Sequence, residues 1–180
     1  MTAALATLHQ HKNILLIDVA LLVALYLVPS LAHLTALPLY MLEPMRVALC
    51  VSLLFTNRTN AYFIALTIPL ASAMITGHPP PLKAALMGIE FSILVVSYSY
   101  LAQRLRISAF AALSAGILLS KLAYYTMKFV ALSTGLLAGS LISTPLQIQL
   151  VVAVGTAAVF GLIEHYRTKN NNKQGSDPRV

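Results

Sequence analysis

Two ionisable residues stand inside apolar stretches where a lipid-facing helix would carry none. Glu90 lies within the apolar run that follows Lys83, and Lys121 lies within the run from Ile107 to Val130. A charge near the centre of a membrane helix costs roughly 2.5–3.5 kcal/mol on insertion scales, so such charges are candidates for a functional site. Glu90 and Lys121 are therefore the first residues to consider for binding chemistry.

Two further polar sets have the spacing to join them. Glu43 and Arg46 are three residues apart, so their side chains can meet on one helix face, either as part of a site or as a self-satisfied interfacial pair. A second set repeats at i, i+3, i+4 and i+7, the spacing of one helix face. Its members are Lys121, Tyr124, Tyr125 and Lys128. The alternative for the last three is an interfacial aromatic belt with a snorkelling lysine.

No catalytic set accompanies these residues. The chain has no GxSxG nucleophile with a partner histidine, no HExxH motif and no Asp-rich metal motif, so we expect no enzyme. Cys50 is the only cysteine, which leaves no CxxC pair, and we expect no metal and no cofactor. His78 follows Gly77 at a turn rich in proline, where it either caps the preceding helix or contributes to a binding site.

The composition identifies the class of protein that must position these side chains. Hydrophobic residues make up 58% of the 180 residues and charged residues only 9%, against about a quarter in soluble domains. We therefore expect a membrane protein that crosses the bilayer several times. The formal charge of +7 comes from basic residues that flank apolar runs, which predicts contact with membrane lipid and not with nucleic acid.

At about 20 residues a span, the chain has room for about six transmembrane helices in one all-α bundle. Residues 1–12 form a short N-terminus, residues 13–166 the transmembrane domain, and residues 167–180 a polar tail that we expect to be disordered. The expected spans are about 13–31, 39–56, 61–76, 83–101, 107–130 and 146–166. Residues 131–144 are small and uncharged, which favours an external loop.

The distribution of basic residues predicts the orientation. One side of the expected bundle carries Lys12, Arg58, Arg104, Arg106, Arg167, Lys169, Lys173 and Arg179, and the other only Lys83 and Lys128. The positive-inside rule places both termini in the cytoplasm. At ~1.5 Å rise per residue, the charges at positions 43, 46, 90 and 121 then all lie in the outer half of the membrane.

This layout resembles the substrate-binding S components of energy-coupling factor (ECF) transporters, and in particular an uncharacterised bacterial group of S-component-like proteins. The resemblance covers residues 13–166 and is carried by Pro69, Gly77-His78-Pro79, Glu90, Ser120-Lys121, Tyr124-Tyr125 and Lys128. It implies location in the bacterial cytoplasmic (inner) membrane and capture of a micronutrient near the external face. It also implies docking to a shared transmembrane subunit, served by separate ATPase subunits, through small residues on the first helix. Ala20 and Ala24 are the corresponding pair here.

Two functions remain open from the sequence. The first is a substrate-binding subunit for transport that takes a small anionic or zwitterionic solute, because Arg46, Lys121 and Lys128 outnumber the two glutamates. Its expected solute-binding residues are Glu43, Arg46, His78, Glu90, Lys121, Tyr124, Tyr125 and Lys128. The second is a non-catalytic assembly or scaffold protein in which the charges form structural ion pairs. A closed pair between Glu90 and Lys121 would favour the scaffold, and an open pocket would favour binding.

Overall fold

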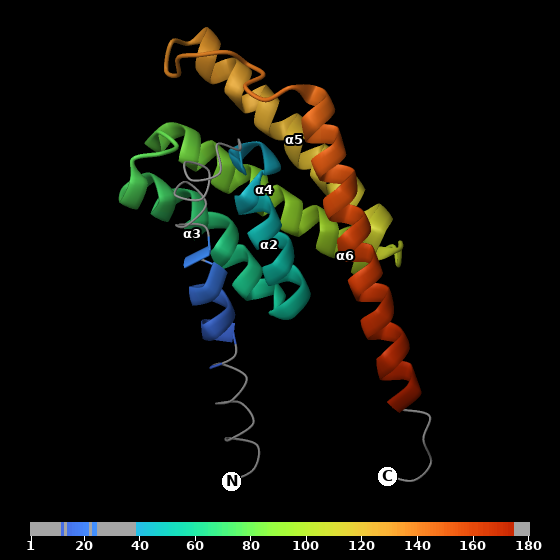
Figure 1. Ribbon diagram of the computed structural model, residues 1–180. Coiled ribbons are helices and arrows are strands. Elements are labelled where there is room, and N and C mark those ends of the chain that lie inside the picture. Colours follow the sequence, from blue (N-terminus) through green and yellow to red (C-terminus); the bar gives the residue numbers. More distant parts are fainter. Residues whose placement is uncertain (1–11, 13, 22, 25–38, 175–180) are drawn as a thin grey trace.

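The computed structural model describes residues 12, 14–21, 23–24 and 39–174, and in these residues all regular secondary structure is helical. Residues 14–21, in the first expected span, are helical. From residue 39 onward the elements are η1 (Leu39–Leu42), α2 (Pro44–Phe55), α3 (Arg58–Thr76), α4 (Pro81–Gln103), α5 (Ala109–Ser133) and α6 (Leu146–Gln174) (Figure 1). The predicted all-α class is thus confirmed for the described part of the chain.

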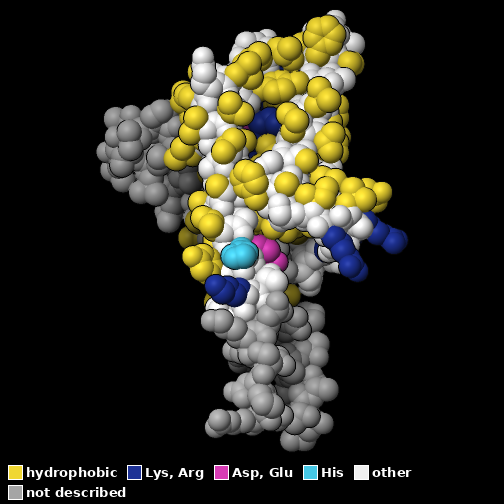
Figure 2. All heavy atoms as spheres, turned by 90° about the vertical axis from the view of Figure 1, so that its right-hand side faces the viewer, with side chains coloured by type: hydrophobic (Ala, Val, Ile, Leu, Met, Phe, Trp, Pro, Cys, Tyr) yellow, Lys and Arg dark blue, Asp and Glu magenta, His cyan; other side chains and the backbone are white. Residues whose placement is uncertain are grey.

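The outer surface is the kind that lipid covers. Helices α3, α4, α5 and α6 are each long and apolar enough to cross a membrane. Large apolar side chains such as Met74, Leu118 and Val151 are more than 70% exposed, and apolar side chains cover much of the face in Figure 2. Water-exposed apolar patches of this extent are rare on soluble monomers, so the chain is a membrane protein.

The expected number of six spans stays a prediction. The α2 helix has 12 residues, about 18 Å at 1.5 Å per residue, and does not cross a hydrocarbon core of ~30 Å alone. Much of the first expected span, residues 13–31, lies outside the described residues. The cytoplasmic placement of the termini also stays a prediction.

The second expected span, residues 39–56, is not one continuous helix, which corrects the sequence-based boundary. It divides at Glu43 into η1 and α2, and Glu43 has a left-handed backbone with φ 50° and ψ 54°. Proline disfavours helical geometry in the residue before it and has no amide hydrogen to donate, so Pro44 begins a new helix instead of continuing the old one. The break turns the Glu43 side chain into the protein.

Helix α6 continues past Tyr166, the expected end of the transmembrane domain, through Gln174, while the disorder expected for the polar tail stays a prediction. The segment from Arg167 to Gln174 contains neither proline nor glycine, and the first glycine after Tyr166 is Gly175. Arg167 also donates to the carbonyl oxygen of Leu54 at the end of α2 and lies over the Phe55 ring. These contacts hold α6 against α2 beyond the apolar stretch.

The long helices form hairpins around a common core. Gly77 ends α3 with φ 69°, and the hydroxyls of Ser72 and Thr76 both donate to the carbonyl oxygen of His78, which fixes the turn into α4. Helix α4 packs most extensively against α3 and α5, and α6 packs on α5. Fully buried core side chains come from five helices, among them Leu49, Ile68, Leu94, Leu113 and Phe160. The α3–α4 turn and the α5–α6 loop lie at the same end of this core as the start of α2.

Glycine permits a close approach between α5 and α6. A Cβ atom on Gly161 would lie 2.8 Å from the Cβ of Phe110 and 3.2 Å from its backbone nitrogen, both too short for ordinary contact. Small residues are the usual means by which membrane helices approach each other closely. Gly155, two turns earlier on α6, has open space at the same position.

We therefore predict that Gly161→Ala destabilises the protein by about 1–3 kcal/mol, because the helices must separate to accept the methyl group. Gly155→Ala is the matched control, and it should leave stability unchanged or raise it slightly through higher helix propensity. Thermal unfolding of the two purified variants in detergent measures the difference. Equal melting temperatures would show that the close contact at Phe110 is not required.

Candidate functional site

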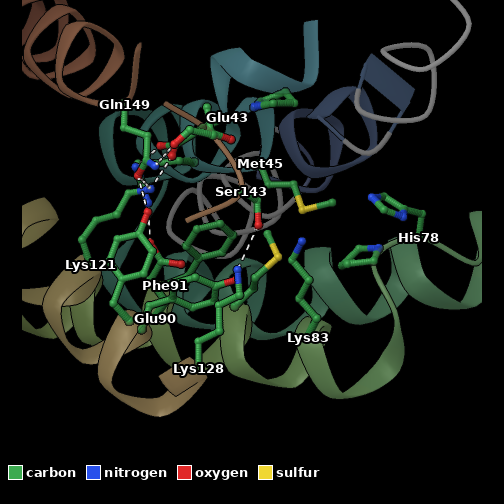
Figure 3. A pocket seen from close by; sticks show the side chains of 17 residues that line it. Glu43, Met45, His78, Lys83, Glu90, Phe91, Lys121, Lys128, Ser143 and Gln149 are labelled. Carbon is green, nitrogen blue, oxygen red and sulfur yellow. Dashed lines mark hydrogen bonds and ion pairs between the residues drawn. The ribbon is translucent and has the colours of Figure 1, made fainter. Parts of the chain in front are cut away.

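A cavity of about 330 Å³ opens at the end of the bundle where six segments meet. It is lined by the start of α2, the α3–α4 turn, the first half of α4, the second half of α5, the α5–α6 loop and the start of α6. The size is at the small end of the roughly 300–1,000 Å³ typical of ligand sites. Figure 3 shows the lining side chains converging on this space.

A chain of ion pairs runs along one wall of the cavity. Arg46 pairs with Glu43, the residue just before α2, and with Glu90 on α4, and Glu43 also pairs with Lys121 on α5. We call these four residues the charge network. Its two acidic and two basic side chains balance, and Arg46 and Glu90 are 2% and 3% exposed. Buried charges need such partners because desolvation otherwise costs several kcal/mol per ion.

The Lys121 end of the network is extended by neutral groups. Its ammonium donates to Oε1 of Gln149 at 2.8 Å, and the Tyr125 hydroxyl donates to the same oxygen at 2.7 Å. The Gln149 amide nitrogen donates to the carbonyl oxygen of Thr144 at 2.6 Å. This set joins α5, α6 and the loop between them, so the charge network is tied to the loop that borders the cavity.

Lys128 is the buried cation of α5, and no carboxylate among the described residues pairs with it. Its ammonium donates to the carbonyl oxygen of Leu141 at 2.8 Å and to the Ser143 hydroxyl at 2.9 Å. The same nitrogen lies 5.9 Å from the centre of the Tyr124 ring. Lys128 is only 3% exposed, so its positive charge is buried with neutral partners alone.

Lys83 and His78 complete the lining near the α3–α4 turn. Lys83 is half-buried and makes no hydrogen bond or ion pair with any residue that the structure describes, and His78 is exposed at the cavity mouth. In Figure 3, Lys121, Glu43 and Gln149 gather at one end of the space, while Lys83 and His78 lie toward the other. The balanced charges and the uncompensated ones thus occupy different parts of the cavity.

The central pairing question from the sequence has a specific answer. Within residues 39–174, Glu90 and Lys121 form no ion pair with each other and are linked through Arg46 and Glu43. The network still leaves one buried donor without an acceptor among the described residues, the Nε of Arg46. An unsatisfied buried donor costs about 1–3 kcal/mol, which a water or a ligand oxygen would recover.

All eight solute-binding candidates from the sequence line this one cavity. They are Glu43, Arg46, His78, Glu90, Lys121, Tyr124, Tyr125 and Lys128. The sequence pattern predicted that the four residues from α5 share one helix face and that the charges at positions 43, 46, 90 and 121 lie at one depth. The role of these residues in binding stays a prediction. In the described residues no cluster of three or more His, Cys, Asp or Glu is arranged to hold a metal ion.

Sequence reasoning missed several lining residues. Lys83 was interpreted only as a topology marker, although it stands two residues after the last proline of the turn. Gln149 is a polar side chain inside an apolar run, which is a usable signal that was not considered. Met45, Met87 and Phe91 carry no signal beyond hydrophobicity, because an apolar residue in a membrane helix can face lipid, core or cavity.

The candidate docking pair lies away from the cavity. Ala20 and Ala24 are both exposed, on the helical segment that precedes the bundle core. That segment is joined to α3 by a hydrogen bond of 2.9 Å from the Asn60 amide to the Asp18 carboxylate. The two alanines are therefore accessible to another helix.

Comparisons with protein-family models, with curated proteins and with solved structures found no match to this chain. The site is accordingly interpreted from its own geometry.

The charge network makes a graded prediction for stability. Arg46→Met removes the only ion-pair partner that Glu90 has among the described residues and one partner of Glu43, so we expect a loss of about 3–5 kcal/mol. Lys121→Met should cost clearly less, because Glu43 keeps Arg46 and Lys121 is partly exposed. Melting temperatures of the two variants in one detergent provide the measurement.

Glu164→Gln is the surface control, since the pair between Glu164 and Arg167 is 3.8 Å long and partly exposed, and such pairs contribute at most about 1 kcal/mol. The double variant Arg46→Met with Glu90→Gln should recover part of the loss, because it removes the stranded carboxylate. If Arg46→Met is no more harmful than Glu164→Gln, the network does not stabilise the fold.

Proposed function

We propose that this protein is the substrate-binding subunit of a membrane uptake system, and that it captures a small anionic or zwitterionic solute in the cavity. The observation that carries the proposal is the charge of the lining. Four basic side chains, Arg46, Lys83, Lys121 and Lys128, face two carboxylates, Glu43 and Glu90. The excess positive charge is held in a concave site rich in aromatic and sulfur side chains, which is a favourable place for an organic anion.

The proposal includes the topology and the cellular setting. The chain crosses the bacterial cytoplasmic membrane about six times with both termini in the cytoplasm, so the cavity opens toward the outside. The basic residues gathered away from the cavity, such as Arg58, Arg104 and Arg106, support this orientation through the positive-inside rule. Solute would then enter from the external side near His78.

By its resemblance to ECF S components, the subunit would deliver its solute with the help of a transmembrane partner and separate ATPases. Exposure of Ala20 and Ala24 supports a docking role for the first helix, because small side chains let a partner helix approach closely.

A membrane scaffold is the second candidate, and a specific observation favours it. Three ion pairs close the charge network into a continuous chain across α2, α4 and α5, which is what a purely structural role requires. The cavity, the uncompensated lysines and the unsatisfied Arg46 Nε are what a scaffold does not require. These features favour binding over a structural role alone.

Solute binding is tested by the thermal stability of the purified protein in the presence of a panel of water-soluble micronutrients. A true ligand at a hundredfold excess over its Kd should stabilise the folded state by about 2.7 kcal/mol. We expect stabilisation from anionic or zwitterionic compounds and none from cations of similar size, because the lining is net positive. If no compound shifts the melting temperature while Arg46→Met unfolds the protein, the scaffold function is the better account.

Partner docking is tested by co-purification. Replacing both Ala20 and Ala24 by Leu should abolish recovery of a transmembrane partner and its ATPases, since the larger side chains block close helix contact. Solute-induced stabilisation should be unchanged, because both alanines lie outside the cavity. Leu16→Ala, at an exposed position on the same segment, is the control and should preserve recovery. Equal recovery of the partner with the unchanged protein, the double Leu variant and Leu16→Ala would exclude the alanine pair as the docking site.

A further inference from the structure

The cavity has two chemically different ends, and this difference defines the class of its ligand. At one end the charge network is internally balanced, since each of its four charged groups pairs with another. At the other end Lys83 and Lys128 have no acidic partner among the described residues. A ligand charge placed at the balanced end would have to displace Glu43 or Glu90, whereas an anion beside the two lysines displaces no charge.

Between these ends the wall is apolar. Met45 comes from α2, and Met87 and Phe91 come from α4, one and two turns after Lys83. Figure 3 places Ser143 beside the Lys128 ammonium, and it shows the Met45 side chain on the side of the cavity where Lys83 and His78 lie. Thioethers and an aromatic ring are suitable contacts for a flat or flexible apolar body. A ligand that matches this cavity therefore needs a charged group at one of its ends and an apolar body next to it.

We propose, on the basis of the solute-binding function above, that the ligand is a small amphipathic organic anion. Its carboxylate or phosphate group lies between Lys83 and Lys128, and its apolar body lies against Met45, Met87 and Phe91. The charge network serves as the fixed wall of the site and not as the receptor for the anion.

Lys128 connects this anion to the loop that borders the cavity. Its ammonium now bonds to Leu141 and Ser143, two neutral acceptors in the α5–α6 loop. An arriving anion is a stronger acceptor than either, because a charge-assisted hydrogen bond is roughly twice as strong as a neutral one. The three donor positions of the lysine allow the anion and part of the loop to be held together.

The same chemistry could come from a soluble acid or from an anionic lipid, and the cavity size favours the soluble acid. A space of about 330 Å³ accommodates a small molecule but not the two acyl chains of a phospholipid. The side facing Lys83 and His78 is near the helix ends, where water-soluble compounds have access.

The test uses matched pairs of compounds on the full-length protein in phosphatidylcholine nanodiscs. The probes are benzoate, benzamide, phenyl phosphate and inorganic phosphate, with affinity measured by thermal shift and calorimetry. We expect benzoate or phenyl phosphate to bind at least about tenfold more tightly than benzamide, because only the anions pair with the lysines. Inorganic phosphate should bind more weakly than phenyl phosphate, since it lacks the apolar body.

Variants then locate the anion. Lys83→Met should weaken binding of the aryl anion about tenfold or more while leaving the melting temperature of the unliganded protein unchanged, because Lys83 has no described partner to lose. Lys128→Met should weaken binding as strongly, and Lys128→Arg should retain it. Lys169→Met, an exposed lysine on α6 outside the cavity, is the control and should bind as the unchanged protein does.

The outcomes separate this inference from the function on which it rests. The anion site is wrong, and the binding function stands, if micronutrients bind but benzamide binds as tightly as benzoate. The same conclusion holds if Lys83→Met and Lys128→Met bind the aryl anion as tightly as the unchanged protein. If no probe and no micronutrient binds, both are wrong. If phosphatidylglycerol in the nanodisc alone stabilises the protein and blocks benzoate, the site belongs to a lipid headgroup and the soluble ligand is overturned.

Discussion

The arrangement of this membrane bundle depends on the buried Arg46 guanidinium, which joins two carboxylates. It holds the start of α2 against α4 through Glu90 and, through Glu43, against α5. None of these charges is tolerable alone in the interior of a membrane protein, so each fixes the position of the next. The left-handed backbone at Glu43 is part of the same constraint, because it directs the carboxylate inward at the point where η1 ends and α2 begins.

Because these four charges neutralise one another, the two remaining lysines give the cavity its net positive charge. Lys83 and Lys128 are not needed to balance the network, and in the described residues nothing acidic balances them. Lys128 also holds the α5–α6 loop through Leu141 and Ser143, but a neutral donor could do this without the cost of burying a charge at 3% exposure. The combination of a neutral wall and an uncompensated positive end is the observation on which the proposed anion capture rests.

Much of this organisation could be predicted from the sequence, and the failures have physical causes. The Glu90 and Lys121 anomaly, the i, i+3, i+4, i+7 stripe and the glycine-opened turn pointed to residues that now line one cavity, because charge in an apolar run and helical period are local signals. The interruption at Glu43 was missed because the sequence does not distinguish a proline in the first turn of a continuous span from a proline that starts a new helix after a break. The role of Arg46 as a bridge between Glu43 and Glu90 depends on how α2 and α4 pack, which a single sequence does not specify.

Native mass spectrometry of the protein released gently from its own membrane tests the central claim most directly, because it requires no guess about the solute. The account predicts a small-molecule adduct of acidic character on the unchanged protein, and loss of that adduct when Lys83 and Lys128 are both replaced by Met. Retention of the same adduct by the double variant, or an adduct that is a cation, would contradict the assignment of a positively charged binding end.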